Sequence, residues 1–212
     1  MRILQEIYPF CAFAVKQGQL VMNLSHFPLN DALSLQSLLK CIPLGLVVEI
    51  GAWTGRSTCL IGHYVKKAGG KFFTIDNFKG SPGSPQVEHD FGDNVRQTLD
   101  YNTKRLGVDV EILDGYSDSF VKDFKDESID FMFIDADHTY TQFKKDFENW
   151  YPKIKKGGIF SGHDYNGKDY DERFVEEDCV GGVHHGISKV LKDWDVMTSP
   201  GSSVWVLKGG RT

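Results

Sequence analysis

Hydrophobic residues in this chain gather into short runs, and helical patterns fill the stretches between them. Five runs have the composition of β-strands, and most of their apolar residues are consecutive instead of alternating with polar ones. Consecutive apolar residues are typical of strands that are covered on both faces. The five predicted strands cover residues 45–50, 71–76, 109–114, 130–135 and 157–162.

The stretches between these runs have helical spacing and end near glycines. One helix is predicted over 57–67, and a second ends at Gly107. A third begins after Thr139, which forms a capping box with Gln142 and so favours a helix start at this point. Alternation of strands with helices predicts an α/β fold with a doubly wound, mostly parallel sheet.

The C-terminal part adds a last helix and two short segments of β character. The helix is predicted over 187–194, and the segments 195–199 and 203–208 are separated by a turn. This pair is predicted to form an antiparallel hairpin, which brings the sheet to seven strands. Neither an internal repeat nor a low-complexity linker is present, so one domain is predicted over 1–212, with a helical N-terminal segment (1–40) and a core (45–207).

Composition and charge exclude several classes of partner. The chain is 41% hydrophobic and 25% charged, its net charge is −5, and its lysines and arginines form no cluster that would bind a phosphate backbone. No apolar run approaches the roughly 20 residues that span a bilayer. The scattered cysteines fit a reducing compartment, so the predicted location is cytoplasmic, without nucleic acid or membrane as partner. The apolar stretch 7–15 is a candidate helix for packing on a second copy of the chain.

The first predicted strand runs into a glycine-rich turn, "VVEIGAWTGRST". Gly51 and Gly55 allow a tight turn, and the following helix offers free N–H groups to an anion. Trp53 stands where a dinucleotide-binding fingerprint has a glycine, which disfavours NAD(P). A purely structural strand-to-helix turn is the alternative interpretation.

Carboxylates and histidines follow the other strands. Asp76 ends the second strand, where an acid can accept both ribose hydroxyls or, alternatively, cap the next turn. Asp135 ends the fourth strand, His138 follows three positions later, and the pair His163-Asp164 follows the fifth strand. These strands are predicted neighbours, so the groups form a candidate site. The alternative for His138 is a capping role, and for the intervening Asp137 a helix N-terminal acid.

Five of these segments together resemble a known family. They are "VVEIGAWTGRS", "FFTID", "EILDGYSDS", "DFMFIDADHTY" and "KKGGIFSGHDY". They resemble the successive motifs of class I S-adenosylmethionine-dependent methyltransferases, and within these the metal-dependent small-molecule O-methyltransferases of the catechol, caffeoyl-CoA and macrolide-sugar types. The resemblance covers about residues 45–207 and implies the Rossmann-like methyltransferase fold.

The resemblance implies a binding site for S-adenosylmethionine. Its methionine part would lie against the glycine turn and its acid, its ribose at the acid that ends the second strand, and its adenine in the turn after the third strand. The residues that match these positions are Glu49, Gly51, Ala52, Trp53, Gly55 and Ser57; Asp76 and Asn77; Gly115, Tyr116, Ser117 and Asp118; and Asp135.

The same resemblance implies a divalent metal ion, Mg²⁺ or Mn²⁺. Asp135 matches a metal ligand and a catalytic position, His138 matches a catalytic base, and His163 with Asp164 match the remaining ligands. Two acids, or an acid and an amide, are usual at that pair, so His163 is a departure. Imidazole suits Mn²⁺, Fe²⁺ or Zn²⁺ better than Mg²⁺. Alternatively, His163 supports ligands that are Asp135, Asp164 and Asp137.

The predicted function is metal-assisted transfer of a methyl group from S-adenosylmethionine to a hydroxyl of a small molecule, such as a sugar or a natural product. Two alternatives are an NAD(P)-dependent oxidoreductase and a methyltransferase-like module that binds the cofactor without catalysis. The long loops 77–93 and 165–185 are candidate lids. The second is rich in acids, which is typical either of a solvated loop or of a lid over a cationic acceptor.

Overall fold

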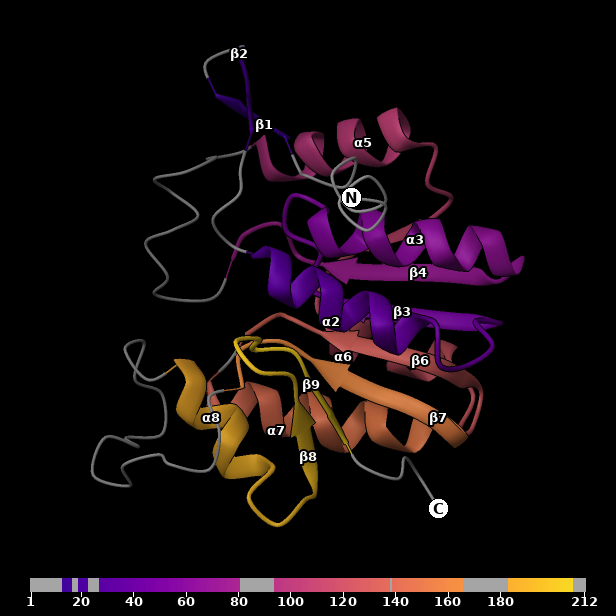
Figure 1. Cartoon of the computed structure of the whole chain (residues 1–212), viewed down its shortest axis with the longest axis vertical. Coiled ribbons are helices and arrows are strands. Elements are labelled where there is room, and N and C mark those ends of the chain that lie inside the picture. Colours follow the sequence, from indigo (N-terminus) through magenta and orange to yellow (C-terminus); the bar gives the residue numbers. More distant parts are fainter. Residues whose placement is uncertain are drawn as a thin grey trace.

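The computed structural model describes residues 13–16, 19–22, 27–80, 94–137, 139–165 and 183–207. The described part of the chain contains a seven-stranded sheet in the order β5-β4-β3-β6-β7-β9-β8 (Figure 1). The first five strands in this order are parallel, and the last two form the antiparallel C-terminal hairpin. The strands are β3 (Leu46–Ile50), β4 (Lys71–Asp76), β5 (Glu111–Asp114), β6 (Ile129–Ile134), β7 (Ile154–Gly162), β8 (Val196–Thr198) and β9 (Trp205–Leu207). The predicted doubly wound α/β fold is confirmed.

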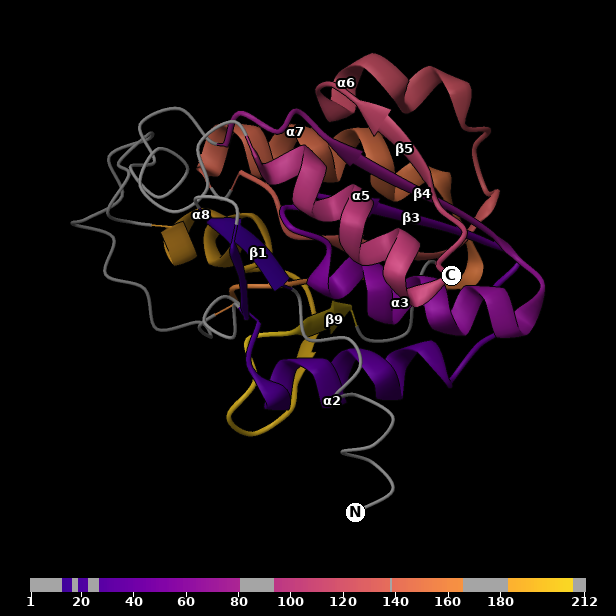
Figure 2. The same cartoon turned by 90° about the horizontal axis from the view of Figure 1, so that it is seen from above.

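Helices cover both faces of this sheet. In Figure 2, α2 and α3 lie on one side of the strands, and α6 and α7 lie on the other. The Thr139 hydroxyl accepts a hydrogen bond from the backbone amide of Gln142, which confirms the predicted helix start. The reciprocal half of the capping box is not formed, because the Thr139 amide donates to Asp137 and the Gln142 side chain donates to Asp146. The helices are α2 (Leu29–Leu39), α3 (Arg56–Ala68), α5 (Val95–Leu106), α6 (Ser117–Phe120), α7 (Tyr140–Trp150) and α8 (Val183–Val190), with 3₁₀ turns η3 (Val121–Asp123) and η4 (Tyr151–Lys153).

The consecutive apolar residues of the central strands supply two separate cores. In β6, Phe131 packs in a cluster with α2 and α3, whereas the next residue, Met132, packs in a cluster with α7 and α8. In β3, Val47 and Val48 divide between the same two clusters. Successive strand side chains point to opposite faces, so a strand covered on both sides must be apolar at each position. This is why the sequence showed consecutive rather than alternating hydrophobic residues.

The N-terminal segment departs from the prediction of a helix over 7–15. Residues Phe13–Lys16 form strand β1, which pairs antiparallel with β2 (Gln19–Met22). Only two residues separate these strands, a common hairpin connection. The helix prediction was therefore wrong over 13–15, and residues 7–12 lie outside the described part. The last helix also differs, since α8 begins four residues before the predicted start at 187.

Four further sequence predictions concern the chain as a whole. Within the described ranges, no helix combines the length and apolarity that crossing a bilayer requires. The division into one domain over 1–212, the cytoplasmic location and a homo-oligomeric state stay predictions.

Gly51 offers a test of how closely the strand ends pack. An alanine Cβ at Gly51 would lie 1.9 Å from the carbonyl oxygen of Asp135, and the backbone φ of Gly51 is +89°. Gly69 has a similar φ of +72°, but a Cβ there would meet nothing within 4 Å. We expect Gly51→Ala to lower the free energy of unfolding by about 3–5 kcal/mol and Gly69→Ala by about 1–2 kcal/mol, measured by urea denaturation. Equal losses would contradict the close approach.

Candidate active site

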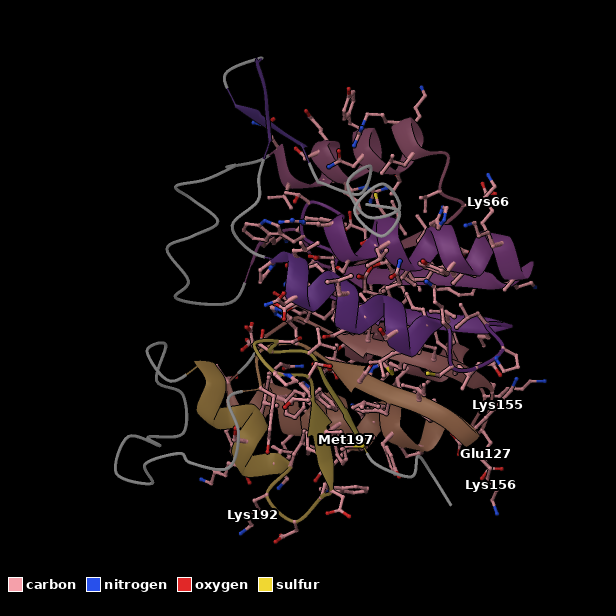
Figure 3. All side chains as sticks on the ribbon, viewed as in Figure 1. Lys66, Glu127, Lys155, Lys156, Lys192 and Met197 are labelled. Carbon is pink, nitrogen blue, oxygen red and sulfur yellow. The ribbon has the colours of Figure 1, made fainter. Side chains whose placement is uncertain are left out.

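The carboxyl ends of the parallel strands meet at one edge, which β7 points toward on the left of Figure 1. The backbone hydrogen-bond ladder continues one residue past each strand. Four backbone amides each donate to a backbone carbonyl of the neighbouring strand over 2.8–3.0 Å. The pairs are Gly115 to Asp76, Gly51 to Ile75, Asp135 to Ile50, and His163 to Ile134. Lys155 and Lys156, labelled in Figure 3, lie at the start of β7 and therefore at the opposite edge. The ladder brings the predicted site residues of the glycine loop, Asp76, the turn after β5, Asp135, and the pair 163–164 to one edge.

Asp76 holds the glycine loop against β4. Its Oδ2 accepts hydrogen bonds from the amides of Ala52 and Trp53, each at 2.8 Å, and its Oδ1 accepts one from the amide of Phe78 at 2.7 Å. Burial raises the pKa of Asp76, and these backbone bonds act in the opposite direction without cancelling the effect. The Oδ1 of the adjacent Asn77 accepts from the Lys79 amide, 2.7 Å away. Asp76 thus performs the capping role predicted as an alternative. Its Oδ2 already accepts two hydrogen bonds, whereas its Oδ1 accepts one and retains accepting capacity for a ligand.

Glu49 lies beneath the same loop and is completely buried. Its Oε2 accepts hydrogen bonds from the hydroxyls of Thr58 (2.6 Å) and Thr74 (2.7 Å). Among the described residues, its Oε1 has no partner in hydrogen-bond geometry. Burial raises the pKa of Glu49 to about 7, neighbouring hydroxyls oppose this, and the charge of Asp135 adds to it. The orphaned oxygen leaves Glu49 suited to a cationic or hydrogen-bond-donating ligand group.

The turn after β5 is anchored by α7. The Ser117 hydroxyl donates a hydrogen bond to Asp146, and Asp118 accepts from Lys145 and from Asn149. Burial raises the pKa of Asp146 to about 6. The sequence analysis missed Asp146, because an acid on an amphipathic helix is ordinarily solvated. Tyr116 is 59% exposed and Gly115 has a φ of +151°.

Asp135, His163 and Asp164 form a group whose ligand atoms all lie within 4.8 Å of one another. The His163 Nδ1 lies 3.2 Å from the Asp164 Oδ1 and 3.6 Å from the Asp135 Oδ1. Asp137 is not part of this group. Its Oδ1 accepts from the Thr139 amide at 2.9 Å, as expected of an acid at a helix start.

The carboxylates around His163 favour a positive charge within this group. Burial acts to lower the pKa of His163, but the charge of Asp135 and hydrogen bonds to Asp135, Asp164 and Asp31 outweigh it and raise the pKa to about 12. Either a proton on His163 or a cation between the three side chains supplies that charge. Two carboxylates and an imidazole nitrogen are a donor set that suits a divalent metal with mixed oxygen and nitrogen ligands.

Several predicted residues are outside the described part of the chain. These are His138, the predicted base, and most of both long loops (81–93 and 166–182), including the acidic stretch. Asp31, in contrast, is a described residue that the sequence analysis did not select. It contacts His163 although 132 positions separate them.

A family profile described as a methyltransferase domain matches residues 48–165, more than half of the chain. The chain belongs to this methyltransferase family. The match contains every site residue predicted from the sequence, and it confirms the resemblance to class I S-adenosylmethionine-dependent methyltransferases. Asp31 lies outside the matched interval.

Solved structures share the fold of this methyltransferase. An O-methyltransferase from Bacillus cereus, in complex with S-adenosylhomocysteine, has a TM-score of 0.61 at 17% identity, covering 98% of this chain and 90% of that chain. TomG from Streptomyces achromogenes, an O-methyltransferase involved in tomaymycin synthesis, in complex with S-adenosylmethionine, has a TM-score of 0.62 at 13% identity, covering 97% and 86%. At these identities, the likeness establishes the architecture.

The raised pKa of Glu49 predicts a pH-dependent stability. Because the folded-state pKa of about 7 lies above the ordinary value of 4.5, protonation of Glu49 favours the folded state. That contribution is fully present below pH 4.5 and is lost as the pH rises through 7. We expect the free energy of unfolding of Glu49→Gln, measured by urea denaturation, to rise by roughly 3 kcal/mol relative to that of the wild type as the pH goes from 5 to 8. Glu148→Gln, on the exposed face of α7, is the control and should follow the wild type; a Glu49→Gln difference that does not change with pH would contradict the assignment.

Proposed function

We propose that this protein transfers the methyl group of S-adenosylmethionine to a hydroxyl group of a small molecule, with the assistance of a divalent metal ion. The observation that carries the proposal is the convergence of Asp135, His163 and Asp164 beside the glycine loop. Gly51 and the Asp135 carbonyl are in direct backbone contact, so a cofactor on the loop would lie next to the three-residue group.

The described geometry supports the proposed cofactor-binding roles. The orphaned Glu49 oxygen and the loop from Gly51 to Ser57 are suited to the methionine part. Asp76 and Asn77 would bind the ribose hydroxyls, and the turn from Gly115 to Asp118 would receive the adenine, with the exposed Tyr116 ring available for stacking. The loop residues proposed for these contacts are Ala52, Trp53, Gly55 and Ser57, together with Ser117 from the adenine turn and Asp135 from the end of β6.

The metal-binding roles fall to Asp135, Asp164 and the Nδ1 atom of His163. A divalent ion held there would lower the pKa of an acceptor hydroxyl and fix its oxygen in place. His138 is proposed as the base, because it matches the catalytic-base position of the O-methyltransferases that the sequence resembles, three residues after Asp135. In the overall step, the sulfur–methyl bond breaks as the methyl–oxygen bond forms. The hydroxyl proton passes to His138, and S-adenosylhomocysteine leaves.

The acceptor is proposed to be a hydroxylated sugar or natural product. The resemblance to small-molecule O-methyltransferases supports this class, as does the shared fold with TomG. An NAD(P)-dependent oxidoreductase is disfavoured by Trp53 in the glycine loop. Methyl transfer to any hydroxyl acceptor would distinguish an enzyme from a module that binds the cofactor without catalysis.

Ligand-induced stabilisation tests the cofactor. We expect S-adenosylhomocysteine at about 100 times its Kd to add roughly 2.7 kcal/mol of stability, and so to raise the melting temperature by about 5–10 °C. NAD⁺ at the same concentration should leave it unchanged. Stabilisation by NAD⁺ and not by S-adenosylhomocysteine would contradict the proposal.

Two neighbouring aspartates provide a matched pair for catalysis. We expect Asp135→Asn to lower metal-dependent methyl transfer at least about 100-fold, since it removes a proposed ligand. Asp137→Asn, two positions away, keeps an oxygen that accepts from the Thr139 amide and removes only the charge at the helix start, so it should cost about 0.5 kcal/mol of stability with activity within a few-fold of wild type. The assay follows labelled methyl groups from S-adenosylmethionine to a panel of phenolic, catechol and sugar acceptors. Equal effects of the two substitutions would argue against the role of Asp135.

A further inference from the structure

Asp31 is a buried acid in the first turn of α2, outside the family-matched interval. Only 1% of its surface is exposed. Burial alone would raise the pKa of Asp31, but hydrogen bonds from His163, Ser202 and Ser203 and the charge of His163 lower it below the ordinary value. The backbone amide of Ser203 can only donate, so the Asp31 Oδ1 is an acceptor, and a carboxylate has no hydrogen of its own to give.

The bonds that Asp31 accepts are divided between its two oxygens. Its Oδ1 accepts from the Ser202 hydroxyl at 2.7 Å and the Ser203 amide at 2.8 Å. Its Oδ2 lies 2.9 Å from the His163 Nε2 and 3.3 Å from the Ser203 hydroxyl. The two hydrogen bonds to Oδ1 hold the carboxylate against the β8–β9 connection, and in this orientation Oδ2 faces the imidazole of His163.

The donor and acceptor roles in the contact between Asp31 and His163 are determined by this arrangement. Because the carboxylate only accepts, the His163 Nε2 carries a hydrogen and donates it. The other ring nitrogen, Nδ1, faces Asp135 and Asp164. The ring has little freedom to turn, because His163 is 5% exposed, packs against Phe27 at 5.2 Å between ring centroids, and has its backbone carbonyl bound by the Trp205 indole at 3.0 Å.

We propose that Asp31 is a positioning residue that holds His163 with Nδ1 directed at the metal site, so that the imidazole serves as a nitrogen ligand beside the carboxylates of Asp135 and Asp164. The inference rests on the metal site of the proposed function and extends it to a helix outside the family-matched interval. Carboxylates that accept from the distal nitrogen of a ligating histidine orient the ring and strengthen the ligand, and their loss typically lowers metal affinity 10–100-fold.

A purely structural role for Asp31 is the competing explanation. Asp31 also joins α2 to the β8–β9 connection, where Asn30 donates to the Gly201 carbonyl at 3.2 Å. A tether would affect the stability of this junction and would leave the metal site unchanged. The test must therefore report on the metal site itself.

Binding of Mn²⁺ to the full-length protein separates the two roles. Free Mn²⁺ is followed by electron paramagnetic resonance in wild type, Asp31→Ala, Asp31→Asn and Asn30→Ala. We expect Asp31→Ala to weaken Mn²⁺ binding 10–100-fold, and Asp31→Asn to recover part of this because its amide oxygen still accepts from Nε2–H. Asn30→Ala removes the bond to the Gly201 carbonyl at the same junction without touching Asp31 or His163, and should stay within about twofold of wild type. The ratio of Mn²⁺ affinity to Mg²⁺ affinity should fall in Asp31→Ala. In that variant Nδ1 of His163 is no longer held at the site, and the oxygen ligands that remain favour Mn²⁺ less.

Each part of the proposal can fail separately. Wild-type affinity for Mn²⁺ in Asp31→Ala, with a lowered melting temperature, would overturn the positioning role and leave the metal site standing. Absence of Mn²⁺ binding in a wild type that binds S-adenosylhomocysteine would overturn the metal site and leave the cofactor site standing.

A second measurement needs no Asp31 variant and covers the case in which Asp31→Ala does not fold. In the wild-type protein labelled with ¹⁵N-histidine and loaded with Zn²⁺, nuclear magnetic resonance should show the His163 ring with its hydrogen on Nε2. The signal is assigned by its loss in His163→Gln. A hydrogen on Nδ1 in the loaded protein would overturn the proposal.

Discussion

The backbone ladder at the carboxyl edge of the sheet is the constraint on which the site depends. Parallel strands end at the same edge, and here the hydrogen bonds extend one residue beyond each strand to Gly115, Gly51, Asp135 and His163. Each of these residues is therefore fixed in register with its neighbour before any side chain interacts. The absence of a Cβ at Gly51 lets the loop reach the Asp135 backbone, which places the proposed cofactor and metal sites side by side.

This arrangement concentrates acids that would repel one another in isolation. The protein offsets their charge by different local means: threonine hydroxyls at Glu49, backbone amides at Asp76, and His163 between Asp31, Asp135 and Asp164. Burial raises the pKa of Glu49 in spite of those hydroxyls, and the surrounding carboxylates raise the pKa of His163 in spite of its burial. The ionised form of Glu49 therefore costs stability, whereas the protonated form of His163 adds it. Both favour a positive charge in the site, which the sulfonium and ammonium groups of S-adenosylmethionine and a divalent ion would supply.

The fold and the main positions of the site could be predicted because their signals are local. Two-sided burial makes β3 and β6 continuously apolar, the glycine turn follows directly from a strand, and the pair His163-Asp164 stands at a strand end. Local pattern was insufficient at the N-terminus, where an apolar stretch at 13–15 reads equally as helix or strand and pairing with 19–22 decides. Asp31 could not be found in this way either. Its position in the first turn of a helix is fully explained by the helix dipole, and its partner is 132 residues away.

The most direct test of the account is a crystal structure of the protein with S-adenosylhomocysteine and Mn²⁺, with anomalous diffraction at the manganese edge. The account predicts one anomalous peak bound by Asp135, Asp164 and the Nδ1 of His163, with the ribose of the nucleoside at Asp76 and its adenine on the turn from Gly115 to Asp118. A manganese peak elsewhere on the protein, with His163 turned away from Asp135 and Asp164, would contradict it.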